Sequence, residues 1–153
     1  EIRRRFPGDM SAPRCELFML TTRARPGPDV GRAWRLADSV AKLAPANRRQ
    51  FFELNAHMLV GAVLARAGLK DSAASVVERS KGDSEMNPTR DLALFGAFVY
   101  TQLGDTQKAT DLLGVYLQVN VRLRAAYADD PGWWFRGISG DPGFKRLVGS
   151  SAR

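Results

Sequence analysis

Few side chains in this sequence could take part in catalysis or hold a metal. The chain has one histidine, His57, and one cysteine, Cys15, and these are too few soft ligands for a zinc or iron–sulfur site. His57 falls in the middle of an expected helix, where a packed histidine is far more common than a catalytic one. Cys15 follows Arg14, whose charge could favour a thiolate, but a small residue without special reactivity is the simpler interpretation.

Motifs that mark known active sites are also missing from the sequence. The glycine-rich loops that hold phosphates, G-x4-G-K-[ST] and G-x-G-x2-G, do not occur. The adjacent carboxylates Asp129 and Asp130 precede a proline, and helix capping explains them without catalysis. We therefore expect a chain that is not an enzyme and that needs no cofactor and no metal.

Positive charge is concentrated in the N-terminal third. The formal net charge is +7, and residues 1–50 carry eleven basic and five acidic side chains. Arg3, Arg4 and Arg5 form the densest basic run. Such a run can contact the phosphates of nucleic acid or of an anionic membrane surface, and it can equally be a solvated stretch without a partner. The basic residues are scattered and lack the interleaved aromatic residues that bind single-stranded nucleic acid.

Hydrophobic periodicity predicts that the regular structure is helical. From Val30 onward, apolar residues recur at i, i+3, i+4 and i+7, which is the spacing of one helical face. Capping residues and terminating Gly or Pro residues delimit expected helices at 30–44, 47–67, 70–79, 88–103 and 106–127, the last with a break near Asn120. Two Asp-Pro pairs, at 130–131 and 141–142, begin two short helices. Residues 1–28 read as an extended arm, in which the apolar run 17–20 is either a short helix or a strand.

The most specific signal is an internal repeat with an interval of 36 residues, from Gly61 to Ala97. The residues of the first copy are Gly61, Leu64, Gly68 and Ala73, and those of the second are Ala97, Tyr100, Gly104 and Ala109. In each copy a helix ends at Gly and another starts two or three residues later. The small residues would let two antiparallel helices approach closely.

This pattern resembles the tetratricopeptide repeat, whose consensus is W-x2-L-G-x2-Y, then G, A-x3-F and P, over about 34 residues. The matching segments are Val60-Gly61-x2-Leu64, Gly68 and Ala73-x3-Val77, then Gly96-Ala97-x2-Tyr100, Gly104 and Ala109-x3-Leu113. The chain departs from the consensus Trp at His57 and Ala93, and from the consensus Pro at Glu85 and Val121. The resemblance implies helix pairs stacked into a solenoid.

In this family, peptides lie on the face lined by the first helix of each pair. Carried over by position, that partner-binding groove would consist of Asn55, Met58, Ala62, Arg66, Asp91, Leu94, Phe98 and Gln102. Several of these positions are apolar where some family members carry the Lys and Asn that clamp a carboxylate. The resemblance therefore implies a hydrophobic or helical segment as the ligand.

The end of the chain carries a second resemblance. Asp130-Pro131-x-Trp133-Trp134-Phe135 and Asp141-Pro142-x-Phe144-x2-Leu147 are similar to the segment that closes tetratricopeptide arrays in many bacterial multidomain signalling proteins. As a cap, this segment would place Trp133, Trp134, Phe144 and Leu147 over the last helix pair. Two adjacent indoles cannot both point inward on one helix, so we expect Trp133 or Trp134 to be exposed as an aromatic anchor for a partner.

Together these patterns predict an all-α chain with an extended basic arm over residues 1–28. A tetratricopeptide-like solenoid of antiparallel helix pairs follows over 29–149, with a helical cap at 130–149 and a tail at 150–153. We expect a non-catalytic protein–protein interaction or scaffolding module that acts as a subunit or regulatory region of a larger assembly. The alternative is a basic module that binds nucleic acid or an anionic membrane surface through its N-terminal third. No apolar run reaches the ~20 residues of a membrane-spanning helix, so we expect a soluble chain, in the cytoplasm, in the periplasm or in a membrane-associated complex, with the cytoplasm slightly favoured.

Overall fold

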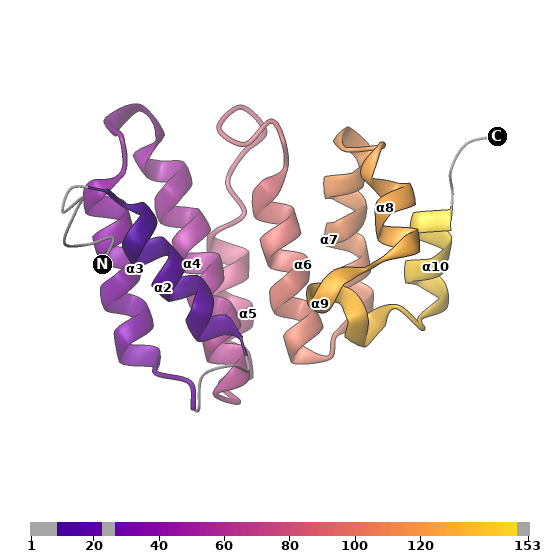
Figure 1. Ribbon diagram of the computed structural model, residues 1–153, viewed down its shortest axis with the longest axis horizontal. Helices are drawn as coiled ribbons and strands as arrows, with labels where there is room; N and C mark the ends of the chain where they lie inside the picture. Colours follow the sequence, from indigo (N-terminus) through magenta and orange to yellow (C-terminus); the bar gives the residue numbers. More distant parts are fainter. Residues whose placement is uncertain (1–8, 23–26, 150–153) are drawn as a thin grey trace. The chain divides into compact units, whose positions relative to one another are not determined.

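The computed structural model describes residues 9–22 and 27–149, and the chain forms two compact units. Unit 1 comprises Glu1–Gly82 and unit 2 comprises Asp83–Arg153. All regular structure in the described part of the chain is helical (Figure 1), which confirms the predicted all-α class. The boundary between the units falls inside residues 29–149, for which the sequence predicts one domain.

Unit 1 contains four α-helices and one short 3-10 helix among its described residues. They are α2 (Ser11–Thr21), α3 (Val30–Leu43), η1 (Ala46–Arg48), α4 (Arg49–Arg66) and α5 (Lys70–Arg79). Helix α4 packs against α3 on one side and α5 on the other, and α2 lies across α3 and α4 (Figure 1). Because α4 has neighbours on three sides, most of its side chains are buried.

Unit 2 is built around one long helix pair and a series of short helices. Its elements are α6 (Asp91–Leu103), α7 (Thr106–Val119), α8 (Leu123–Asp129), α9 (Gly132–Phe135), η2 (Arg136–Ile138) and α10 (Pro142–Gly149). Helices α6 and α7 pack along their length, α10 packs on α7 and α8, and α9 packs on α6. The break predicted near Asn120 separates α7 from α8.

The 36-residue repeat appears in the structure as two turns with the same hydrogen bonds. After α4, Gly68 has φ +77° and the Leu69 N–H donates to the Leu64 carbonyl at 3.0 Å. After α6, Gly104 has φ +76° and the Asp105 N–H donates to the Tyr100 carbonyl at 3.0 Å. This six-to-one bond over a left-handed residue is the Schellman motif, which glycine adopts without a Cβ clash. Each unit therefore contains one helix hairpin with the same turn.

Aspartate side chains cap the start of three of the helices, α3, α7 and α10. The Asp29 carboxylate accepts from the Arg32 N–H at 2.8 Å, and the Asp105 carboxylate accepts from the Lys108 N–H at 3.1 Å. Asp141 accepts from two backbone N–H groups at the start of α10, at 2.7 and 3.1 Å. Each bond satisfies a donor that the helix itself leaves without a partner.

The predicted start of a helix at Asn87-Pro88 is wrong. Helix α6 begins at Asp91, after Arg90, which has a left-handed backbone with φ 58° and ψ 26°. Asn87 is buried in the preceding loop, and its side-chain oxygen accepts from the Asp91 N–H at 3.0 Å. Asn87 therefore caps α6 from a position four residues before its first helical residue, with a turn between them.

The expectation of an extended arm is wrong for residues 11–21, which form α2. Its buried face carries Pro13, Leu17, Leu20 and Thr21, spaced at i, i+4, i+7 and i+8 on one side of a helix. Asp9 accepts from the Ser11 N–H at 2.8 Å just before the helix. Of the two alternatives for the apolar run 17–20, the structure shows the helix.

Candidate functional site

Helix α2 is fixed on unit 1 by a contact at each of its ends. Near its start, the Arg14 guanidinium lies over the Phe52 ring of α4, 5.8 Å from the ring centre. At its end, the Arg66 side chain of α4 donates to the Leu20 carbonyl. Carbonyl groups at the end of a helix lack partners and carry partial negative charge, so a guanidinium there is favourable.

An ion pair joins α2 to α3 as well. The Arg32 guanidinium of α3 lies 3.0 Å from the Glu16 carboxylate of α2. Both side chains are about a third or more exposed, and an exposed pair of this kind contributes roughly 0.2–1 kcal/mol. The pair orients α2 on α3 and adds little to its stability.

The α4 half of the predicted groove is therefore not open to a ligand. Asn55, Met58 and Ala62 are 2%, 1% and 0% exposed. Arg66, one turn after Ala62 on the same side of α4, is engaged with α2. The residues predicted to line a groove on α4 are thus buried, and Arg66 at the end of this stripe contacts α2 of the same chain.

Asn55 has an unusual environment for a buried side chain. It lies on α4 between Phe52 and Arg66, and among the described residues no group accepts a hydrogen bond from its Nδ2. A buried donor without an acceptor costs about 1–3 kcal/mol. The apolar residues around Asn55 on α4 are thus well buried, whereas the side-chain amide of Asn55 lacks a hydrogen-bond acceptor among the described residues.

The α6 half of the predicted groove is covered within unit 2. Phe98 has no exposed surface, and its ring stacks on Trp134 at a centroid distance of 4.6 Å and an angle of 20°. Leu94 and Gln102 are half-buried. Asp91 lies at the start of α6, where its carboxylate accepts from the Thr89 hydroxyl at 2.7 Å. Phe98 therefore forms part of the core rather than of an open groove.

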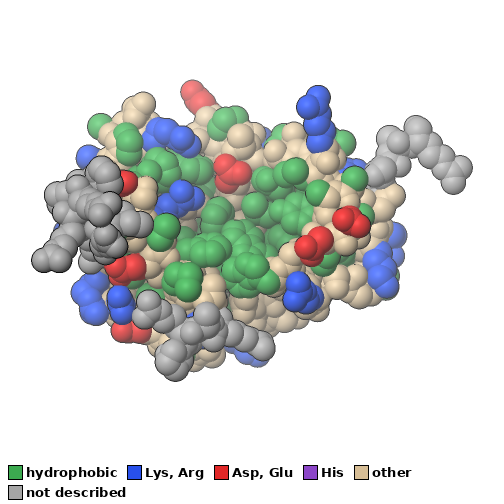
Figure 2. All heavy atoms as spheres, in the orientation of Figure 1, with side chains coloured by type: hydrophobic (Ala, Val, Ile, Leu, Met, Phe, Trp, Pro, Cys, Tyr) green, Lys and Arg blue, Asp and Glu red, His purple; other side chains and the backbone are tan. Residues whose placement is uncertain are grey.

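Trp133 and Trp134 differ in exposure, as expected for adjacent indoles. Trp134 lies against Phe95 and Phe98, whereas Trp133 is 44% exposed. Trp133 nevertheless has edge contacts with Phe98 at 5.2 Å and with Trp134 at 6.0 Å. Hydrophobic side chains gather over α6 on the face shown in Figure 2. Trp133 is thus a large apolar side chain that is exposed and yet held by two rings.

Phe135 is as fully buried as Phe98, although the predicted cap residues did not include it. Phe135 has no exposed surface and packs edge-on against Tyr127 at 5.7 Å. Of the predicted cap residues, Phe144 is buried and Leu147 is half-buried. Three consecutive aromatic residues have no periodicity, so the sequence could not indicate which of them points inward.

Burial of Tyr127 predicts that unit 2 loses stability in alkali. Burial, with a smaller effect from Tyr116, raises the pKa of Tyr127 from its ordinary value of 10.0 to about 12. Because the folded unit holds this proton more tightly than the unfolded chain does, the stabilisation is complete below pH 10.0 and is lost as the pH rises toward 12. We expect the urea midpoint of the native chain to fall over this interval.

Tyr127→Phe should reduce that dependence on pH, because phenylalanine has no proton to lose. Urea unfolding of both proteins, followed by circular dichroism below and above the ordinary tyrosine pKa, measures the difference. Equal slopes for the two proteins would show that Tyr127 ionises as freely in the folded as in the unfolded chain.

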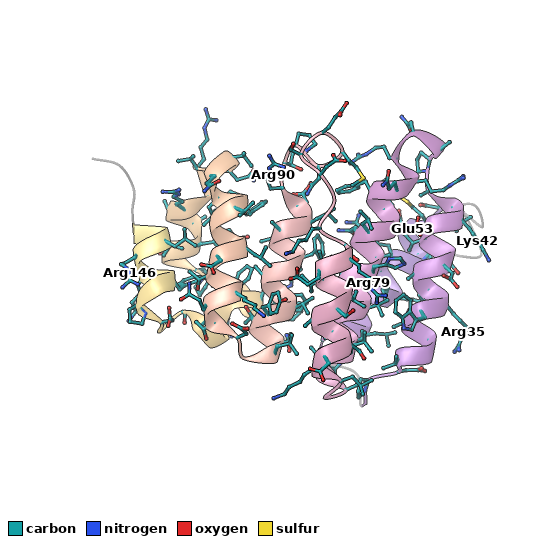
Figure 3. All side chains as sticks on the ribbon, turned by 180° about the vertical axis from the view of Figure 1, so that it is seen from behind. Arg35, Lys42, Glu53, Arg79, Arg90 and Arg146 are labelled. Carbon is teal, nitrogen blue, oxygen red and sulfur yellow. The ribbon has the colours of Figure 1, made fainter. Side chains whose placement is uncertain are left out.

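Several arginines of the N-terminal third are engaged within unit 1. Arg48 lies over the rings of Phe51 and Phe52 at 4.9 and 5.1 Å, and Arg14 and Arg32 contact neighbours as described above. Arg35 and Lys42 point away from α3 into solvent (Figure 3), with the exposed carboxylate of Asp38 between them in sequence. Arg3, Arg4 and Arg5 lie outside the described residues. The described part of this third therefore does not present a surface of one charge sign.

The residues considered for chemistry occupy ordinary structural positions. His57 packs edge-on against Trp34 at 5.4 Å, and Cys15 is exposed on α2. Asp130 accepts from the Gly132 N–H at 2.8 Å, which supports its interpretation as a cap. Among residues 9–22 and 27–149, no three His, Cys, Asp or Glu side chains are grouped closely enough to hold a metal ion. None of the helices in these ranges is long and apolar enough to span a membrane.

Comparison with known proteins does not identify a family for this chain. No family model matches the chain, and neither curated proteins nor solved structures gave a significant match.

Proposed function

We propose that this chain is a tetratricopeptide-like module for protein–protein interaction, without catalysis of its own. It would act as a subunit or regulatory region of a larger assembly. The repeated Schellman hairpin and the small residues buried in both hairpins support the family resemblance. The observation that carries the interaction role is the exposure of Trp133.

An exposed tryptophan that is already fixed is well suited to anchor a partner. Trp133 has nearly half of its surface exposed, and its contacts with Phe98 and Trp134 restrict its rotamers. Binding therefore costs less side-chain entropy than it would for a mobile residue. Tryptophan is among the residues that most often dominate interface energies, with losses of about 2 kcal/mol or more on truncation to alanine.

The test compares three forms of the full chain purified with an affinity tag from its native cells. We expect the native chain and Val119→Ala to retain the same stoichiometric protein partner, which mass spectrometry identifies. Trp133→Ala should bind the purified partner about thirtyfold or more weakly, by the energy of an interface hot spot. Val119 is the matched control because it is also an exposed apolar residue of unit 2.

Three results would speak against this proposal. Recovery of nucleic acid in place of a protein would favour the basic-module alternative. Equal affinity of Trp133→Ala and the native chain for the partner would remove Trp133 as the anchor. Loss of binding in Val119→Ala alone would indicate that the interface lies on the exposed apolar residues of α7 instead.

A further inference from the structure

We propose that the face formed by α3 and α4 is a receptor for an amphipathic helix of a partner protein, and that α2 is the resident ligand which this partner displaces. This inference rests on the proposed interaction role and adds a second surface, on unit 1, with a partner of defined chemistry. It is independent of Trp133, which belongs to unit 2.

Helix α2 itself has the pattern of a helical ligand. Its inner face carries Ala12, Pro13, Leu17, Leu20 and Thr21, all buried, whereas Cys15 and Met19 on the opposite side are exposed. A helix with one apolar face that lies across a pair of helices is a common mode of peptide recognition. The structure therefore shows directly what kind of segment this face accepts.

Two charged side chains on the receptor face determine the direction in which a helix can lie on it. Arg66 engages the Leu20 carbonyl at the end of α2, and Arg32 pairs with Glu16 in its middle. A competing helix would need the same polarity, with its carbonyl end toward Arg66 and an acidic side chain opposite Arg32. These two contacts define the partner more narrowly than apolar spacing alone.

Asn55 lies one turn after Phe52, which contacts Arg14 of α2, and it is a polar group that α2 does not satisfy. Among the described residues, its buried Nδ2 has no acceptor. A partner helix that places a polar side chain or a free carbonyl beside Asn55 would supply this hydrogen bond. Such a partner gains affinity that α2 does not have.

The attachment of α2 to the same chain sets how strongly a partner must bind. A tethered ligand competes at an effective concentration of about millimolar for a short linker. The apparent affinity for a partner equals the intrinsic affinity multiplied by the fraction of molecules in which α2 is undocked. Weakening the contacts of α2 should therefore strengthen the binding of an added helix.

The test uses this relation: a substitution that weakens the docking of α2 should strengthen the binding of an added peptide. The probe is a fluorescent peptide with the sequence of residues 9–22, and its anisotropy is measured against the full chain. In the chain, Leu17→Ala removes a fully buried side chain from α2 alone. Loss of a buried leucine usually shifts an equilibrium by more than tenfold, so we expect the peptide to bind Leu17→Ala about tenfold tighter or more.

Two further substitutions in the chain control this result. Met19→Ala changes an exposed residue of the same helix and should leave the affinity for the peptide unchanged. Glu16→Gln breaks the ion pair with Arg32 and should tighten binding by about threefold, the size expected for an exposed pair. Because Glu16 lies at the surface, this variant decides the question if circular dichroism shows that Leu17→Ala has lost its helices.

Two outcomes would overturn the proposal. One is a peptide affinity that is unchanged or weaker in Leu17→Ala with native circular dichroism, or unchanged in Glu16→Gln. The other is a dimer of the native chain that forms with rising concentration and is lost with Leu17→Ala, because the occupant would then be α2 of a second copy. Either result leaves the Trp133 interface untouched, so the two proposals fail separately.

Discussion

Phe98→Ala is expected to lower the free energy of unfolding of unit 2 by about 3–5 kcal/mol. Phe98 is completely buried and contacts both indoles of the aromatic cluster, stacked on one and edge-on to the other. Its removal leaves a cavity and breaks two aromatic pairs, each worth about 0.5–1.5 kcal/mol beyond the burial of area. The loss would be a large share of the stability of a small unit.

Tryptophan fluorescence offers a measurement that is specific to unit 2. The chain has three tryptophans, of which Trp133 and Trp134 lie in the cluster and Trp34 lies in unit 1. In a Trp34→Phe background, urea unfolding followed by fluorescence reports on unit 2 alone. Val119→Ala, at an exposed position of the same unit, should shift stability by less than about 0.5 kcal/mol. A loss below about 1 kcal/mol for Phe98→Ala would mean that the cluster repacks around the gap.

Ala73→Leu and Ala109→Leu are expected to destabilise the chain by similar amounts, about 1–3 kcal/mol each. Both alanines have no exposed surface and occupy equivalent positions in α5 and α7, five residues after the turn glycines Gly68 and Gly104. A leucine at either place would push two closely packed helices apart. The comparison therefore tests whether the 36-residue repeat is a repeat of packing as well as of sequence.

Thermal unfolding of the full chain, followed by circular dichroism, measures both effects. Ser72→Leu and Gln107→Leu are matched controls, because they place the same side chain at exposed positions on the same helices. The controls should leave the midpoint nearly unchanged. A large effect at one alanine and none at the other would contradict the equivalence of the two hairpins.

Local signals in the sequence predicted most of the helices. Helix α5 has the predicted bounds, and the predicted stops at Gly68 and Gly104 coincide with the left-handed turns. These features depend on residues close together in the chain, such as Asp29 with Arg32. The start of α6 was missed because Asn87 forms its bond across a turn that includes the left-handed Arg90, and no local pattern distinguishes this cap from an ordinary one.

The candidate site was harder to predict because its state depends on distant contacts. Helical spacing places Asn55, Met58 and Ala62 on one stripe of α4, but it could not show that these residues are buried. The spacing of Leu17 and Leu20 on one face was a usable signal for α2, although periodicity in so short a run is ambiguous. The bond from Arg66 to Leu20 joins residues 46 positions apart, and nothing in the local sequence specifies it.

That separation has a consequence for the synthesis of the protein on the ribosome. Leu20 of α2 is translated 46 residues before Arg66, which binds its carbonyl group. At roughly 5–20 residues per second, several seconds pass before the helix that binds it has been made. During this interval Leu17 and Leu20 can pack against α3 but not against the end of α4, so the nascent chain exposes part of an apolar segment that a chaperone or a waiting partner can bind first.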